Sequence, residues 1–290
     1  MEFPNRMSVS KLTAVTFLLL LILKDSGALQ ITRLSVPSWL KNGSQESVVL
    51  DCEYDFTMKD NHLVVKWFLD NDPEPIYQWI PELGSRYFSY RLQGRVNLDY
   101  SVSPSTEYTR YRAINIINPT TDMSGMYTCN VLSRAGEDLQ KKLMIIYAPP
   151  KEFIFTLSYE KNDDLRLQCE AKGVFPDPEL KLYKLTSTEK LQDLAAVVVQ
   201  MIAHDPYNGY NVTVMKSLNI NTLSRNEPTI FECVLTINGT KFLRERRLFY
   251  YPDELSSKAS RLATIDFKVL VFQILAIFSS CRTLQQKVFS

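Results

Sequence analysis

Cysteine and histidine are the residues of this 290-residue chain that bear most directly on its chemistry. Only two histidines occur, His62 and His204, far apart in the sequence. Acid–base catalysis, nucleophile activation and many metal sites depend on histidine, so its scarcity argues against an enzyme. No serine lies in a G-x-S-x-G motif, and no two cysteines have the C-x-x-C spacing of a zinc site. We therefore expect no catalytic residue, cofactor or metal.

The overall composition is that of a folded, nearly neutral protein. The chain has 33 Lys plus Arg against 32 Asp plus Glu, a formal charge of +1, and 45% of its residues are hydrophobic. The charge provides no excess of basic groups for nucleic acid. The length allows one large or two ordinary domains, and the apolar content is sufficient for a core in each.

The amino-terminal segment has the pattern of a secretory signal peptide. Arg6 and Lys11 precede the apolar run Leu12–Leu23, and Ser26-Gly27-Ala28 provides the small residues of a cleavage site. The alternative is an uncleaved signal anchor. At a rise of 1.5 Å per residue, the run covers only about 18 Å of a hydrocarbon core of about 30 Å. We therefore assign residues 1–28 to a signal peptide cleaved after Ala28.

The carboxyl-terminal segment, residues 253–290, predicts a membrane attachment. Its apolar run Phe267–Phe278 contains a lysine and a glutamine, and a charge near the centre of a spanning helix costs about 2.5–3.5 kcal/mol. Small residues at Ser256-Ser257 or Ser260, a polar spacer and this run are typical of a glycosylphosphatidylinositol (GPI) anchor signal, although polar residues follow the run. A lipid anchor, a weak membrane span and simple secretion remain as alternatives for this extracellular protein.

Between these ends the chain consists of short runs of alternating apolar and polar residues, rich in Val, Ile, Tyr and Phe. Many short strands predict an all-β sandwich or barrel. The pattern starts again after Ala148-Pro149-Pro150, which marks a domain junction. The run Lys190–Met201 fits either a helix or a strand, and we favour a strand. We expect domains at residues 29–148 and 149–252.

Five cysteines are present, and Cys281 lies in the carboxyl-terminal tail, where it is removed or can be acylated. An even number of cysteines in a secreted chain implies disulfides, and four cysteines allow three connectivities. Each half has one cysteine early and one late. The simplest connectivity joins Cys52 to Cys129 and Cys169 to Cys233, with each bridge linking two sheets.

In the first half, Cys52, Trp67 and the segment Gly125–Cys129 resemble the immunoglobulin superfamily. The resemblance implies a variable-type sandwich in which Trp67 packs on the disulfide and Tyr127 hydrogen-bonds back to the backbone. The family usually has Asp six residues before the second cysteine. In this chain Met123 occupies that position, and the acidic residue is Asp122. Whether Asp122 forms the family's usual ion pair with an arginine such as Arg95 is therefore undecided.

The second half resembles a constant-type or intermediate-type domain less closely. Leu182 and Tyr183 stand where the family has Trp, and Phe231 replaces the tyrosine before Cys233. Phenylalanine has no hydroxyl, so the hydrogen bond from this tyrosine to the backbone, called the tyrosine corner, cannot form. We expect a divergent sandwich held by its disulfide and by apolar packing.

Two stretches are similar to the arthropod beaten-path group of neuronal recognition proteins. They are Val65–Phe68 continuing to Glu74–Trp79, and Lys172–Tyr183. The resemblance implies heterophilic binding to another immunoglobulin-type surface protein in cell or axon recognition. Homophilic binding is left open.

Strand alternation predicts a binding face in the first half. If Trp67 and the disulfide face inward, neighbouring residues face outward, and burial of Ile76 and Ile80 would turn Tyr77 and Trp79 outward. The alternative is that both aromatic residues face inward. Exposed aromatic residues beside polar ones are typical of interface cores. The predicted partner-binding residues are Lys66, Phe68, Tyr77, Trp79, Thr128, Asn130 and Leu132.

Three sequons predict N-glycosylation, at Asn42, Asn211 and Asn238. Asn118 is followed by proline and is therefore blocked. None of the three lies on the predicted face. The sequence as a whole predicts a glycosylated cell-surface recognition or adhesion protein that binds another ectodomain. The alternative is a soluble secreted factor that binds microbial surfaces or scavenges a ligand.

Overall fold

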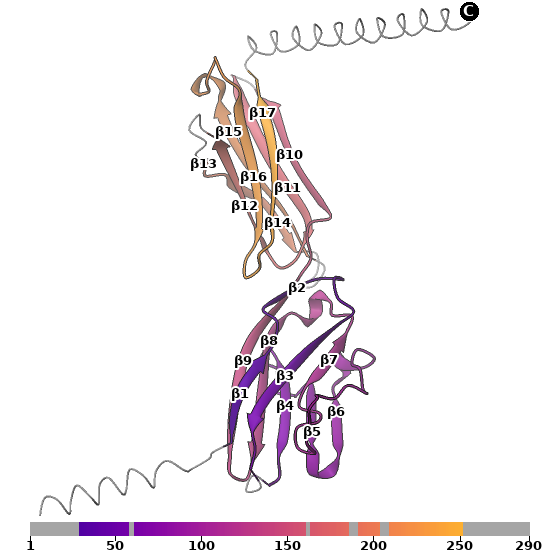
Figure 1. The fold of residues 1–290 in the computed structure, drawn as a ribbon. Helices are drawn as coiled ribbons and strands as arrows, with labels where there is room; N and C mark the ends of the chain where they lie inside the picture. Colours follow the sequence, from indigo (N-terminus) through magenta and orange to yellow (C-terminus); the bar gives the residue numbers. More distant parts are fainter. Residues whose placement is uncertain (1–28, 58–60, 161–162, 186–190, 204–208, 252–290) are drawn as a thin grey trace, which may run out of the picture. The chain divides into compact units, whose positions relative to one another are not determined.

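The computed structural model describes residues 29–57, 61–160, 163–185, 191–203 and 209–251. The predicted signal peptide and the carboxyl-terminal segment 253–290 lie outside these residues. The chain divides into two compact units between Ile146 and Tyr147. Both units consist of β-strands with a few short 3₁₀ turns, so the all-β prediction is confirmed (Figure 1).

The first unit has a sheet in the order β1-β3-β7 and a six-stranded sheet in the order β2-β9-β8-β4-β5-β6. Its strands alternate buried and exposed residues, as β3 does along its whole length, so each sheet turns one face to the core. The strands are β1 (Gln30–Ser35), β2 (Trp39–Lys41), β3 (Ser47–Asp55), β4 (Val64–Leu69), β5 (Tyr77–Ile80), β6 (Ser85–Phe88), β7 (Ile114–Ile117), β8 (Gly125–Ser133) and β9 (Gly136–Tyr147).

The core of the first unit is built around the disulfide Cys52–Cys129, as the sequence predicts. Trp67 lies opposite Cys129 in the register of β4 and β8. It is fully buried, and its indole Nε1 donates a hydrogen bond to the Arg112 carbonyl at 3.1 Å. The buried Tyr127 hydroxyl donates to the Met123 carbonyl at 2.8 Å. The predicted tyrosine corner is therefore confirmed, and it closes the turn that leads into β8.

The structure contains an ion pair between Arg95 and Asp122. The sequence left this pair undecided, because the acidic residue lies one position earlier than in the family pattern. Arg95 Nη1 lies 2.5 Å from Asp122 Oδ2. The 3₁₀ turn Thr121–Met123 explains the shift, because it buries Met123 in the core and leaves Asp122 on the surface side. The carboxylate therefore reaches the guanidinium from a position one residue earlier than the family pattern.

This pair should make the stability of the first unit depend on pH. The hydrogen bond from Arg95, more than any other cause, holds the pKa of Asp122 below its ordinary value. A carboxyl with a lowered pKa stabilises the fold above its unfolded pKa, about 3.9, and loses that contribution as the pH falls through its folded pKa. Because both side chains are partly exposed, the contribution is at most about 1 kcal/mol.

We expect D122N to be less stable than the wild type at pH 7, with the difference shrinking to nothing as the pH drops well below 4. Thermal unfolding of both proteins, followed from pH 7 to pH 2 by tryptophan fluorescence, measures this difference. A difference that stays constant across the range would show that the pair contributes no linked stability.

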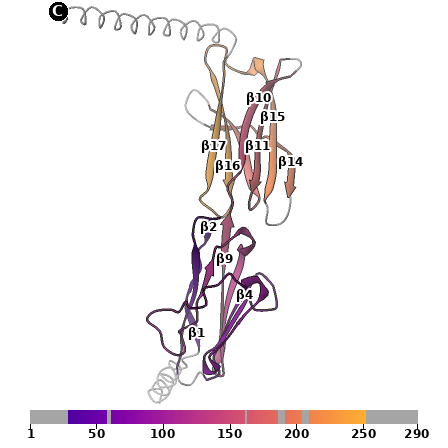
Figure 2. The same ribbon diagram turned by 90° about the vertical axis from the view of Figure 1, so that its right-hand side faces the viewer.

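The second unit has two four-stranded sheets, in the orders β10-β11-β15-β14 and β13-β12-β16-β17. Figure 2 shows β16 and β17 of one sheet beside β10, β11, β15 and β14 of the other. The strands are β10 (Glu152–Tyr159), β11 (Asp164–Val174), β12 (Pro178–Leu185), β13 (Leu191–Asp193), β14 (Val197–Ala203), β15 (Tyr210–Asn219), β16 (Thr229–Ile237) and β17 (Leu243–Tyr250).

Disulfide Cys169–Cys233 links the two sheets of the second unit, as predicted. Leu182 and Phe231 are both fully buried beside it. They take the places that a tryptophan and the corner tyrosine have in the family pattern. Much of the run that was ambiguous between helix and strand forms the strands β13 and β14, so the strand interpretation is confirmed. This unit is therefore a divergent sandwich with an apolar core and no tyrosine corner.

Candidate recognition surface

The candidate site is the outer face of the six-stranded sheet in the first unit. Strand β4 alternates between buried residues, such as Val65 and Trp67, and half-buried residues that point away from the core. Lys66 pairs with Asn130 and Phe68 pairs with Thr128 across β4 and β8. The predicted orientation of Lys66, Phe68, Asn130 and Leu132 is thus present, whereas the Thr128 side chain is mostly covered.

The prediction that Tyr77 and Trp79 face outward is wrong. Their side chains are only 2% and 1% exposed. In the register of β4 and β5 they lie opposite Trp67 and Val65, so they belong to the inner face. The prediction assumes that the strand alternation includes Ile76, but β5 begins at Tyr77. Ile76 is also buried, and it lies in an irregular segment before the strand. A period of two does not extend across such a junction.

The buried aromatic residues have partners inside the unit. The Tyr77 hydroxyl donates a hydrogen bond to the Tyr111 carbonyl at 2.7 Å. The Trp79 ring meets the Tyr111 ring edge-on, with centroids 6.0 Å apart. Burial also raises the pKa of Tyr77 well above its ordinary value, so the phenol stays protonated and can donate. Both residues support the sheet rather than contact a partner.

Other residues occupy the outward positions. Gln78 pairs with Lys66 on one side and with Tyr87 of β6 on the other. Across β8, Asn130 pairs with Leu139 of β9. One row of outward side chains therefore crosses five strands. We call the whole set the outer face; its residues are Lys66, Phe68, Gln78, Ile80, Tyr87, Met126, Thr128, Asn130, Leu132, Leu139, Lys141 and Leu143.

Four large apolar side chains of this face were not found from the sequence. Leu139 and Tyr87 are 49% and 48% exposed, and Leu143 and Met126 are also exposed. The outward direction of Leu139 and Leu143 could have been predicted, because β8 and β9 form a hairpin in which Ser133 pairs with Gly136. A turn this short sets the register, so each outward residue of β8 lies beside an outward residue of β9.

The middle of the outer face contains an unusual polar group. Asn130 Nδ2 donates a hydrogen bond to Glu137 Oε1 at 2.6 Å. Its Oδ1 atom is buried and has no hydrogen-bond partner in the described part of the chain. An unpaired buried acceptor of this kind is uncommon in folded proteins. The face thus presents exposed apolar side chains and two lysines, while this acceptor lies beneath its surface.

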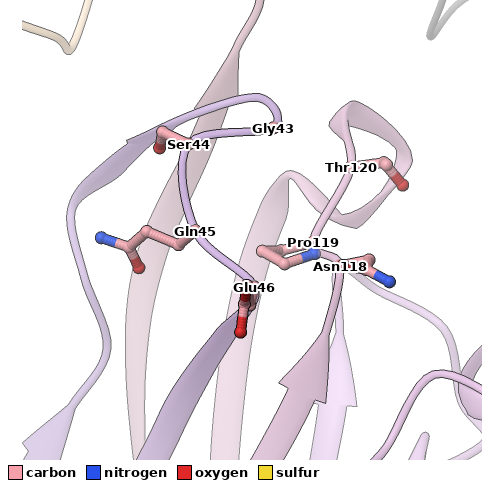
Figure 3. Close-up of a pocket in the computed structure, with 7 residues that line it drawn as sticks. All are labelled: Gly43, Ser44, Gln45, Glu46, Asn118, Pro119 and Thr120. Carbon is pink, nitrogen blue, oxygen red and sulfur yellow. The ribbon is translucent and has the colours of Figure 1, made fainter.

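Two depressions lie among the loops of the first unit. One, of about 210 Å³, lies between the loops Gly43–Glu46 and Asn118–Thr120 (Figure 3). Glu46 is the only titratable side chain among its lining residues. A second depression of about 530 Å³ includes Arg110 and Glu107 in its wall. The described residues contain no group of three or more His, Cys, Asp or Glu that could hold a metal ion.

Of the three predicted glycosylation sites, Asn42 lies in the loop after β2 of the first unit, and Asn211 and Asn238 lie in the second unit. Asn42 and Asn238 are exposed. Asn211 is half-buried on β15, and its Oδ1 accepts a hydrogen bond from the Gly173 amide at 2.9 Å. Glycosylation at the three sites remains a prediction.

No protein-family model and no curated protein sequence matches the chain. Solved structures of similar fold exist. Bovine butyrophilin has a TM-score of 0.53 at 12% identity, over 72% of this chain and 92% of that chain. A chain from the complex of ICOS with ICOS-L and an anti ICOS-L VNAR domain has a TM-score of 0.50 at 15% identity, over 72% and 97%.

These likenesses and the two core disulfides establish the fold class, which is a pair of tandem immunoglobulin-like sandwiches. At sequence identities this low, structural similarity shows the fold alone. The function therefore has to be inferred from the surface residues of this chain. Within the described ranges, none of the helical segments has the length and apolar character needed to cross a bilayer.

Proposed function

We propose that this chain is a cell-surface recognition protein whose first unit binds the ectodomain of another protein through the outer face. The exposed apolar side chains of that face carry the proposal. Leu139, Leu143, Met126 and Tyr87 are all exposed on one sheet, with Phe68 half-buried between them. Exposed apolar side chains interspersed with polar ones on one sheet are typical of a protein–protein interface.

The charges of the outer face favour a heterophilic partner. Lys66 and Lys141 point outward and outnumber the one acidic neighbour, Glu137, which keeps its negative charge while it accepts a hydrogen bond from Asn130. Two copies of such a face would bring like charges together, which is unfavourable. A partner face with apolar side chains and acidic groups would pair with both lysines.

The location and biological role are part of the same proposal. The signal peptide sends the chain to the secretory pathway, and the carboxyl-terminal segment tethers it to the outer surface of the cell, by a lipid anchor or a weak span. The sequence resemblance to the beaten-path group supports another immunoglobulin-type partner and a role in neuronal recognition. Clustering at the cell surface would strengthen individually weak contacts.

A soluble secreted factor is the alternative, and one treatment of expressing cells distinguishes it. A phospholipase specific for glycosylphosphatidylinositol anchors should release the protein from the cell surface if it has a lipid anchor. Constitutive appearance of the full amount in the medium would instead indicate secretion, and retention after treatment would indicate a membrane span.

The substitution L139E tests the outer face. Leu139 lies in the central row and is half-exposed, so a carboxylate there should leave the fold intact and weaken partner binding at least about tenfold, as at an interface hot spot. The measurement is binding of cells that display the full chain to a panel of surface ectodomains. The matched control is I154E, because Ile154 is 44% exposed on β10 of the second unit. Equal binding by L139E and wild type would reject the face.

A further inference from the structure

A second apolar surface crosses one end of the second unit. Leu191 pairs with Leu185, Leu185 with Ile230, and Ile230 with Phe249, so one row crosses all four strands of the sheet β13-β12-β16-β17. The Tyr251 ring stacks beside Phe249, with centroids 6.5 Å apart. We call these five residues the chain-end row.

The chain-end row lies on the outside of the sheet. The neighbours of Ile230 and Phe249 that face inward, such as Phe231 and Cys233, are fully buried. Leu191, Phe249 and Tyr251 are by contrast 45%, 54% and 46% exposed. The next row along the sheet is polar, and Arg247 Nε lies 2.6 Å from Glu232 Oε1. The row of apolar residues that crosses all four strands therefore lies at the end of the sheet where β17 finishes.

The position of the row in the chain indicates what lies close to it. Tyr251 is the last described residue, and the apolar run Phe267–Phe278 begins 16 residues later in the sequence. Even fully extended, that many residues span at most about 55 Å. An anchor attached at Ser260 would shorten the polypeptide span to about 30 Å or less. Any tether in this segment thus keeps the row near the bilayer.

We propose that the chain-end row rests on the surface of the lipid bilayer and orients the second unit on it. This proposal relies on the membrane tether of the proposed function, but not on the outer face of the first unit. Phenylalanine, tyrosine and leucine are the side chains that partition into the boundary between headgroups and acyl chains. A short tether holds the row there at a high effective concentration, so a weak affinity is sufficient.

A tryptophan placed in the row tests the contact. The three native tryptophans, Trp39, Trp67 and Trp79, all lie in the first unit. The full chain, purified in detergent from membranes of expressing cells, is reconstituted into phosphatidylcholine vesicles with plain or brominated acyl chains. The variant F249W adds one emitter to the row. The matched control is L243W, because Leu243 is 56% exposed on the same strand and face at the opposite end.

We expect brominated lipid to quench the emission added by F249W about twofold more strongly than that added by L243W, because an interfacial aromatic residue lies about 5–10 Å into the headgroup boundary. Equal quenching of the two variants overturns the proposal. Shielding of F249W from aqueous iodide without quenching by the lipid also overturns it, because the row is then covered by protein, such as a second copy.

Flotation of the vesicles separates this proposal from the tether. If the full chain does not float with the vesicles, the tether is wrong and the membrane contact falls with it. If the chain floats and F249W is not quenched, the tether stands and only the contact of the chain-end row is overturned. Binding of partner ectodomains by F249W at the wild-type level is expected in either case.

Discussion

Replacing Cys52 and Cys129 together with alanine is expected to lower the free energy of unfolding of the first unit by about 4–5 kcal/mol. The bridge closes a loop with a sequence separation of 77, and the entropy of a closed loop this long gives that magnitude in the chain-entropy model. Domains of this size have total stabilities of about 5–15 kcal/mol. The variant should therefore be close to unfolding at 37 °C.

Denaturant unfolding followed by tryptophan fluorescence measures this loss, because all three tryptophans lie in the first unit. The control is the double alanine variant of Cys169 and Cys233, which removes a bridge of separation 64 from the second unit. That control should leave the tryptophan transition near its wild-type midpoint. An unchanged transition in the Cys52 and Cys129 variant would show that the bridge does not stabilise this sandwich.

The substitution W67A is expected to have the next largest effect, a loss of about 3–5 kcal/mol from the first unit. Trp67 is fully buried opposite Cys129, so alanine leaves a cavity at the centre of the core. The change also removes the donor that the Arg112 carbonyl uses at 3.1 Å. An acceptor left unpaired in the interior adds to the cost.

W67F separates these two contributions, because phenylalanine fills most of the volume and cannot donate the hydrogen bond. We expect its stability to fall between those of the wild type and W67A, by circular dichroism in denaturant. A loss for W67A below about 1 kcal/mol would mean that the core collapses around the site, contrary to a rigidly packed sandwich.

The features implied by the immunoglobulin-like resemblance were predictable from the sequence. The resemblance implies that Cys52, Trp67 and Tyr127 lie together in the core of a sandwich, and the structure brings them together. The strand interpretation of β13 and β14 is also confirmed, in line with the preference of β-branched valines for strands.

The orientation of Tyr77 and Trp79 was not predictable, because it depends on where β5 begins. A start one residue earlier would reverse every side chain of the strand. Ile76 and Tyr77 are both buried, and only the pairing with β4 shows which of them belongs to the regular strand. The Arg95–Asp122 pair likewise depends on a short 3₁₀ turn that no spacing rule specifies.

Binding through the outer face is the central claim, and a glycan placed on that face tests it most directly. The single change L132T turns Asn130 into a glycosylation acceptor in the middle of the face, because a threonine then follows it two residues later. L132A is the control without a glycan. The change R33N places an acceptor on β1, in the other sheet, where Ser35 completes the sequon and the Arg33 side chain is 70% exposed.

The measurement is binding of cells that display each full-length variant to the partner ectodomain recovered with the wild type. We expect glycosylated L132T to lose binding at least about tenfold, because a glycan at the centre prevents close packing of the two surfaces. Glycosylated R33N should bind like the wild type, and L132A should lose far less binding than glycosylated L132T, because it shortens only one side chain of the face. Wild-type binding by L132T that carries the glycan would contradict the account.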